Sequence, residues 1–163
     1  MPLEQVLSFV PTFVLAVFRV AAMFLSAPLF GSSRIPRRVK LMFALITTLA
    51  MVPSVPPAEL PDATWALAAG IAGEILFGFA LGTAVSFVFI AMNWAGEIIG
   101  QQMGLSMGTM LDPEFGQQGS LIGDLYFLLT LVIFLTVRGH HALLRGVLES
   151  FTALPLLSVG VNT

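Results

Sequence analysis

Five apolar stretches separated by short polar segments account for most of the chain. They cover residues 6–30, 41–52, 65–95, 121–137 and 142–157. A helix that spans a bilayer needs roughly 20 apolar residues, so the second stretch is short for a span. The third stretch, at about 1.5 Å per residue, exceeds the ~30 Å hydrocarbon core by about half. We therefore expect an all-α protein with long, partly broken helices and helical hairpins.

The composition places these helices in a membrane. Of the 163 residues, 57% are hydrophobic and 10% are charged, whereas soluble domains carry about 25% charged residues. The formal net charge of −2 argues against nucleic acid as a partner. Because the chain has no cysteine, disulfides, a thiolate nucleophile and Cys-based metal sites are excluded. We expect an integral membrane protein with a single membrane domain over residues 1–163.

The third apolar stretch continues into a segment that combines glycines with methionines. Glycines recur at every fourth position, at Gly96, Gly100, Gly104 and Gly108. This spacing predicts one helical face on which another backbone can approach closely. Asp112-Pro113 is expected to stop the helix, because proline disfavours helical geometry in the residue before it.

Three methionines accompany these glycines, at Met103, Met107 and Met110. Methionine offers a soft and adaptable apolar surface. Two interpretations stay open, namely ordinary core packing and a compliant seal against something that moves past.

Four charged residues fall within or at the edge of the apolar stretches: Arg19, Glu74, Glu97 and Asp124. An isolated charge at the bilayer centre costs about 2.5–3.5 kcal/mol on insertion scales, so such residues usually face a bundle interior, a partner or a water-filled cavity. We favour a buried structural salt bridge of Arg19 with Glu74 or Asp124 over a role in transport.

Glu74 also belongs to a helical face of small residues. Gly78 and Gly82 follow it at four-residue spacing, which predicts a packing strip beside the carboxylate. Glu74 is therefore expected to point into a contact between helices.

The distribution of charge between the stretches conflicts with a simple count of spans. The basic segment 34–40 should be cytoplasmic, yet counting onward puts the acidic segment 112–114 inside and the basic segment 138–145 outside. Either one stretch is a hairpin, or the protein is buried inside an assembly where the rule is relaxed. We favour the assembly.

One short motif suggests an enzyme. Residues 104–108 match GxSxG, the nucleophile elbow of serine hydrolases, but that elbow needs a strand before its serine. An intramembrane serine protease would use Ser106 with His140 or His141 as the base. Helical spacing before Ser106 makes this alternative weak.

Other polar residues indicate no further chemistry. Adjacent histidines on a helix point about 100° apart and chelate one metal poorly. Arg145 and Glu149 have the i,i+4 spacing of a surface ion pair. We expect no catalytic residues, no metal site and no cofactor.

Four segments together resemble the FliR family of flagellar export-gate proteins, which is related to the SctT subunits of injectisome type III secretion. They are FRVAAMFLSAPLFGSSRIPRRVKLMFAL at 18–45, GEILFGFALG at 73–82, AGEIIGQQMGLSMGTMLDP at 95–113 and FLTVRGHHALLRGVLESFTALP at 134–155. The QQMGLS…DP and GHH…SF…LP segments carry most of the specificity, and they fit the flagellar branch better.

The resemblance implies a structural channel subunit in a helical export gate of the bacterial inner membrane, at the flagellar basal body. Its partners would be FliP-like, FliQ-like and FlhB-like subunits, and unfolded flagellar proteins would pass through the channel. The family's pore-plug loop corresponds to residues 104–118, with Met103, Gly104, Met107, Gly108, Met110, Asp112 and Pro113 as plug candidates.

Two further expectations complete this interpretation. Family members usually continue past the position of Leu154-Pro155 with helices that resemble a FliQ-type subunit, so this chain is expected to be a fragment. The alternative to the export gate is a small multi-spanning transporter with Arg19, Glu74 and Asp124 along a solute path.

Overall fold

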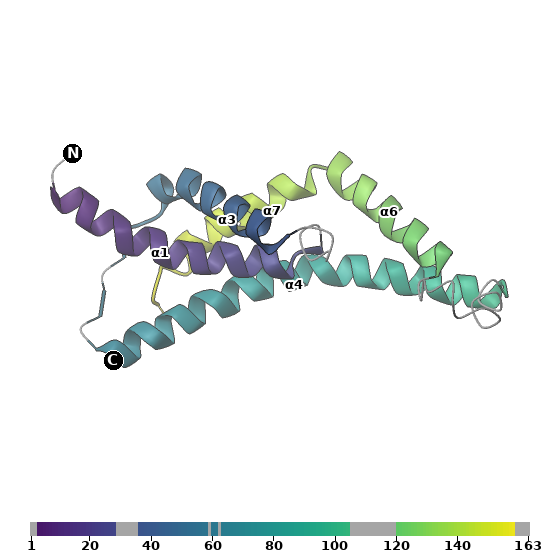
Figure 1. The fold of residues 1–163 in the computed structure, drawn as a ribbon, viewed down its shortest axis with the longest axis horizontal. Helices are drawn as coiled ribbons and strands as arrows, with labels where there is room; N and C mark the ends of the chain where they lie inside the picture. Colours follow the sequence, from purple (N-terminus) through teal and green to yellow (C-terminus); the bar gives the residue numbers. More distant parts are fainter. Residues whose placement is uncertain (1–2, 29–35, 59, 62, 105–119, 159–163) are drawn as a thin grey trace. The chain divides into compact units, whose positions relative to one another are not determined.

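The structure is a computed structural model, and it describes residues 3–28, 36–58, 60–61, 63–104 and 120–158. Within these residues it is helical and contains no strand, so the all-α fold class is confirmed (Figure 1). The elements are α1 (Leu3–Ser26), α3 (Arg37–Met51), the 3₁₀ turn η1 (Val52–Ser54), α4 (Thr64–Gln102), α6 (Leu121–Thr136) and α7 (Gly139–Ala153). In the described part of the chain, each of the five apolar stretches therefore corresponds to one helix.

The longest helix, α4, is continuous over 39 residues. At about 1.5 Å per residue it measures roughly 58 Å, almost twice the ~30 Å hydrocarbon core. It ends at Gln102, earlier than the helix end that we expected at Asp112-Pro113. The reason is Gly104, whose φ of 73° lies in the left-handed region that commonly terminates helices. Gly104 is therefore outside the helical face that holds Gly96 and Gly100.

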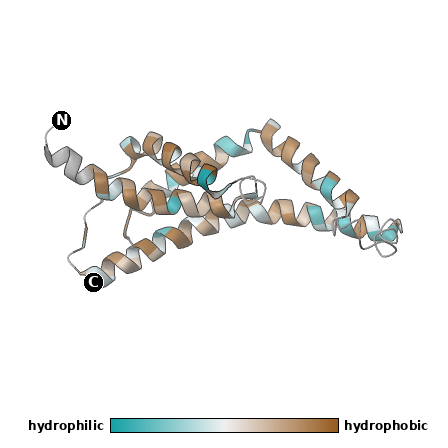
Figure 2. Cartoon of the chain, viewed as in Figure 1, coloured by the Kyte–Doolittle hydropathy of each residue, from teal (hydrophilic) through white to brown (hydrophobic). Residues whose placement is uncertain are grey.

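Two of the described helices are long and apolar enough to cross a membrane, namely α4 and the Phe9–Ser26 part of α1. A third candidate exists only if α6 and α7, which are separated by a break, count as one span. Figure 2 shows that hydrophobic residues predominate along α1, α3, α4 and α6. Helix α3 has 15 residues, about 22 Å, and is too short to span the core.

The chain divides into two compact units. Unit 1 comprises residues 1–84 and 141–163, and unit 2 comprises residues 85–140. The boundary falls inside α4, so this helix contributes its first half to unit 1 and its second half to unit 2. The expectation of a single membrane domain stays a prediction.

Unit 1 has a core built from helices that are far apart in sequence. Helix α1 packs against α3, and a buried cluster joins α1, α3, the η1 region and α7. Its members are Ala16, Val20, Met23, Phe24, Ala44, Val52, Val55, Val147 and Phe151. A hydrogen bond from the Ala58 amide to the Thr12 hydroxyl, 2.9 Å long, also attaches the segment after η1 to α1.

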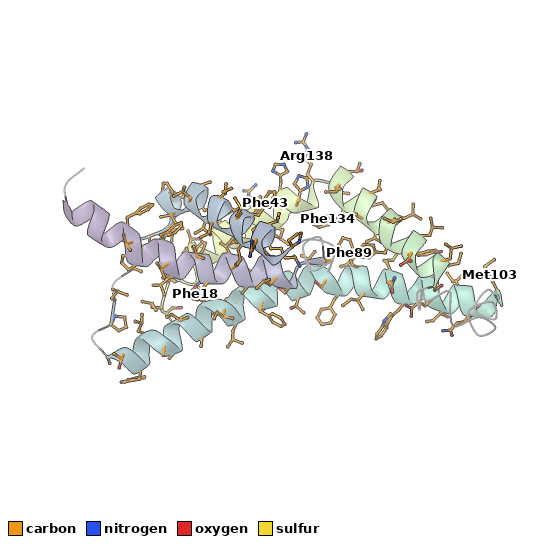
Figure 3. The ribbon with its side chains drawn as sticks, viewed as in Figure 1. Phe18, Phe43, Phe89, Met103, Phe134 and Arg138 are labelled. Atoms are coloured by element: carbon orange, nitrogen blue, oxygen red, sulfur yellow. The ribbon has the colours of Figure 1, made fainter. Side chains whose placement is uncertain are left out.

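Unit 2 is a hairpin of the second half of α4 with α6. The ring of Phe89 lies 5.6 Å from that of Phe127 and 5.5 Å from that of Phe134, in tilted and edge-on geometry. Such arrangements are the favoured ones for aromatic pairs. The side chains of Phe89 and Phe134 are labelled in Figure 3.

Helix α6 has well-defined ends. The Ser120 side chain accepts a 3.3 Å hydrogen bond from the Gly123 amide and caps the N-terminus. At the other end Arg138 adopts a φ of 58°. Gly139 follows because a Cβ there would collide with the Phe134 ring.

Candidate functional site

Two charged side chains form an ion pair at the centre of unit 1. The Arg19 Nε donates to Glu74 Oε2 across 2.6 Å, and the two side chains are 0% and 3% exposed. Arg19 lies on α1 and Glu74 on α4, at a sequence separation of 55 residues. Of the two partners that we considered for Arg19, the structure therefore selects Glu74.

The remaining polar atoms of this pair bind α7 and the residues after it. The Arg19 Nη1 donates to Ser150 Oγ at 3.0 Å, and Nη2 donates to the Leu154 carbonyl at 3.1 Å. On the other side, the Leu157 amide donates to Glu74 Oε1 at 3.1 Å. A single pair of charges thus connects α1, α4, α7 and the segment that follows α7.

Aromatic rings complete the surroundings of the guanidinium. Its central carbon lies 4.5 Å from the centre of the Phe151 ring and 5.6 Å from that of Phe77. Contacts at these distances contribute cation–π attraction, which grows when the cation is removed from water. The charge of Arg19 is therefore held by hydrogen bonds and by rings together.

Glycines allow α4 to lie close to this cluster. A Cβ on Gly78 would collide with the backbone carbonyl of Arg19, and a Cβ on Gly82 would collide with the side chain of Ser26 and with the carbonyl of Met23. Both glycines share a helical face with Glu74. The face contacts α1, as the spacing predicts for a packing strip.

The other two charges of the apolar stretches differ from this pair. Glu97 is half-buried and Asp124 is exposed in the chain, and the expectation that both are buried, for instance against a partner, stays a prediction. Asp124 lies in the first turn of α6, where the partial positive charge of the helix N-terminus favours a carboxylate. Its place at a helix end accounts for an acidic residue beside an apolar stretch.

Close backbone packing holds the hairpin of unit 2 together. A Cβ on Gly96 would meet the carbonyl of Ile122 and the backbone of Gly123, and a Cβ on Gly100 would meet the Ser120 hydroxyl. The end of α4 and the start of α6 are thereby held together.

Most plug candidates lie outside the residues that the structure describes, namely Met107, Gly108, Met110, Asp112 and Pro113. Met103 is described and is 64% exposed just beyond the end of α4 (Figure 3). A Cβ at Gly104 would meet no atom within 4 Å. Glycine is therefore favoured at this position by its left-handed backbone and not by a close contact.

The hydrolase alternative depends on Ser106, which lies outside the described residues. The described chain before it is helix α4 and a turn at 103–104, rather than the strand that a nucleophile elbow needs. Arg145 and Glu149 form an exposed i,i+4 pair at 2.8 Å. Among the described side chains, no three His, Asp or Glu gather as metal ligands would.

Sequence reasoning did not identify three partners of the ion pair: Ser150, Leu154 and Leu157. Two of them contribute backbone groups, which have no signature in side-chain chemistry. Proline at position 155 was the one available signal, because the chain must leave the helix there and its last carbonyls then need other donors.

Comparison of the sequence with known proteins places the chain in a family. Residues 10–162 match the family described as bacterial export proteins, family 1. The chain belongs to this family. The resemblance on which we based our expectations is thus confirmed.

Curated members of this family are similar over most of the chain. The flagellar biosynthetic protein FliR of Escherichia coli K12 is 36% identical over 160 residues, which cover 98% of this chain and 61% of that protein. The FliR of Bacillus subtilis 168 is 32% identical over 151 residues, 91% of this chain and 58% of the relative. The chain therefore spans about three fifths of the length of these relatives.

Proposed function

We propose that this chain is a structural subunit of the flagellar type III export gate and helps to form the conduit for unfolded flagellar proteins. The observation that carries the proposal is membership of the bacterial export family together with similarity to proteins named flagellar biosynthetic protein FliR. These names concern export and flagellar assembly, and they give no support to the hydrolase or transporter alternatives.

The apolar surface supports a subunit that works inside an assembly. Helix α3 buries a narrow face and exposes a broad apolar one, although it is too short to cross a bilayer. The exposed residues of that face are Leu41, Met42, Phe43, Leu45, Ile46 and Leu49. A contiguous apolar face of this kind marks contact with lipid or with protein. An assembly partly outside the lipid plane accommodates both the short α3 and the long α4.

The partners of such a subunit would be FliP-like, FliQ-like and FlhB-like proteins in the bacterial inner membrane. The polypeptide in transit is unfolded, so a gate for it cannot depend on one set of specific hydrogen bonds. Methionine surfaces re-pack against many partners. We assign the plug role to the segment 104–118 on this ground.

Co-purification tests the assignment to the gate. The tagged chain, expressed in its own bacterium in the full-length form that the gene encodes, would be extracted in mild detergent, and its partners identified by mass spectrometry. Recovery of FliP-, FliQ- and FlhB-like proteins in one large particle is expected. A full-length form that is recovered alone, while the other subunits co-purify with each other, contradicts the proposal.

A deletion tests the plug. Removal of residues 106–116 should leave the particle assembled but make the membrane permeable to small ions, because an apolar obstruction is lost from the conduit. The readout is ion leak in cells that hold equal amounts of the complex. An unchanged leak in assembled mutant particles contradicts the plug assignment and leaves the gate assignment intact.

A further inference from the structure

The residues after α7 form a short strap across unit 1. We define the strap as residues 154–158. It begins after Ala153, where α7 ends, and it turns through a 3.1 Å hydrogen bond from the Ser158 amide to the Pro155 carbonyl. Leu157 within it is 2% exposed and has a φ of 65°. A leucine with this φ is uncommon, so the contacts of the strap must hold it there.

Two backbone groups of the strap end on the buried charges. The Leu154 carbonyl accepts from Arg19 Nη2 and the Leu157 amide donates to Glu74 Oε1, each at 3.1 Å. The last carbonyls of a helix have no partner within it, and the C-terminal end of the helix favours a nearby cation. Arg19 therefore acts as a cap on α7 that is supplied by a different helix.

The chemistry of the two side chains decides which group donates and which accepts in each of these hydrogen bonds. A guanidinium can only donate and an ionised carboxylate can only accept. Arg19 therefore suits a carbonyl and Glu74 suits an amide. The strap presents a carbonyl at Leu154, which lies at Arg19, and an amide at Leu157, which lies at Glu74.

We propose that Arg19 and Glu74 form a clasp, a site that binds the backbone of the strap and sets the path by which the chain leaves α7. The two side chains are positioning residues. The proposal concerns the architecture of unit 1 and does not depend on the proposed function.

A plain ion pair would not account for this arrangement. Buried ion pairs can often be replaced by apolar side chains without loss of stability. Here an apolar replacement would leave the buried Leu157 amide and the partly buried Leu154 carbonyl without these partners, which is unfavourable. Gly70 adds a notch on α4, because a Cβ there would collide with the Leu157 side chain. The charges and the notch thus act on the same strap.

A charge swap separates a clasp from an ion pair. In the double variant Arg19→Glu/Glu74→Arg the attraction between the two positions is restored, but the donors and acceptors are exchanged. The carboxylate now faces the Leu154 carbonyl and the guanidinium faces the Leu157 amide. We expect the Leu157 amide to exchange hydrogen at least about tenfold faster than in the wild type, as the loss of a hydrogen bond to a charged group implies. Core amides of α1 should stay protected.

The measurement uses the chain in nanodiscs, with amide exchange resolved at the strap by NMR or by fragmentation mass spectrometry. Recovery of wild-type protection at Leu157 in the charge-swapped protein would overturn the clasp, since a plain ion pair predicts that recovery.

A gentler variant decides the question if the swapped protein does not fold. Glu74→Asp keeps the charge beside Arg19 but is one methylene shorter, so it cannot reach both partners. We expect roughly tenfold faster exchange of the Leu157 amide, again from the loss of one charge-assisted bond. The matched control is Glu149→Asp, in an exposed pair on α7, which should leave the strap unchanged. Equal protection of Leu157 in the Glu74→Asp and Glu149→Asp proteins would also overturn the proposal.

Discussion

The two units of this chain are held together in different ways. Unit 1 joins helices far apart in sequence. Gly78 and Gly82 bring α4 close to α1 there, and the contacts at the centre of the unit are also directional, because Arg19 and Glu74 bind each other and the groups around them. Unit 2 is a local hairpin in which glycines bring two backbones together and Phe89 fills the space beside them.

This difference shows what each kind of contact can specify. Directional bonds to buried charges define one arrangement, because any other arrangement leaves a charge without a partner. Close packing of small residues defines how closely two backbones approach each other.

The largest effect is expected from removing one buried charge. Arg19→Leu leaves Glu74 buried without its cation, which should lower the free energy of unfolding of unit 1 by about 3–5 kcal/mol. Unfolding by SDS in mixed micelles measures this change. The double variant with Glu74→Leu should lose less than the sum of the single variants, and a strictly additive result would mean that the two side chains do not interact.

A smaller effect is expected from adding a side chain where α4 and α6 are in close contact. Gly96→Leu places a side chain against the carbonyl of Ile122 and the backbone of Gly123, so the two helices must separate. Overpacking of this kind costs about 1–3 kcal/mol. Amide exchange in the first turns of α6 should rise. The control is Gly146→Leu on α7, where no atom lies within 4 Å of a Cβ, and an equal effect there would argue against close packing in unit 2.

A still smaller effect is expected at the end of α4. Gly104 has room for a side chain but a φ of 73°, so Gly104→Ala introduces backbone strain alone, about 1 kcal/mol. The last turn of α4 should exchange faster. Gly104→Asn should be tolerated better than alanine, because asparagine enters the left-handed region more readily. Alanine and asparagine with identical exchange would contradict this account of the helix end.

The smallest effect is expected from the exposed pair on α7. Arg145→Ala removes an i,i+4 partner of Glu149 whose side chains are 79% and 64% exposed. Its contribution to stability is a few tenths of a kcal/mol at most. The SDS unfolding midpoint should be unchanged within error. A loss of stability as large as that caused by Arg19→Leu would contradict the claim that the exposed pair contributes much less to stability than the buried one.

The sequence predicted the helices better than the contacts between them. Runs of apolar residues located the five α-helices that the structure describes, because burial in a membrane or an assembly requires such runs. The four-residue spacing of Gly78 and Gly82 indicated the face of α4 that meets α1. The end of α4 was misplaced, because a left-handed glycine at 104 acts locally whereas we relied on the stronger signal of Asp112-Pro113.

The partners of Arg19 show the limit of this reasoning. Glu74 was one of two candidate partners, and only the packing of the helices decides between them. The contacts with Leu154 and Leu157 involve backbone groups, which every residue except proline carries in the same form. Their selection depends on the path of the chain after α7, and this path is a tertiary property.

One measurement tests the division between the two units most directly, namely amide exchange over the whole chain in nanodiscs for Glu74→Ala and Gly96→Leu, side by side. The account predicts that Glu74→Ala accelerates exchange in α1, α7 and the strap, whereas Gly96→Leu accelerates it in α6 and in the second half of α4. If both variants accelerate exchange over the same residues, the two units are one cooperative structure, and the contrast between directional bonds and close packing fails.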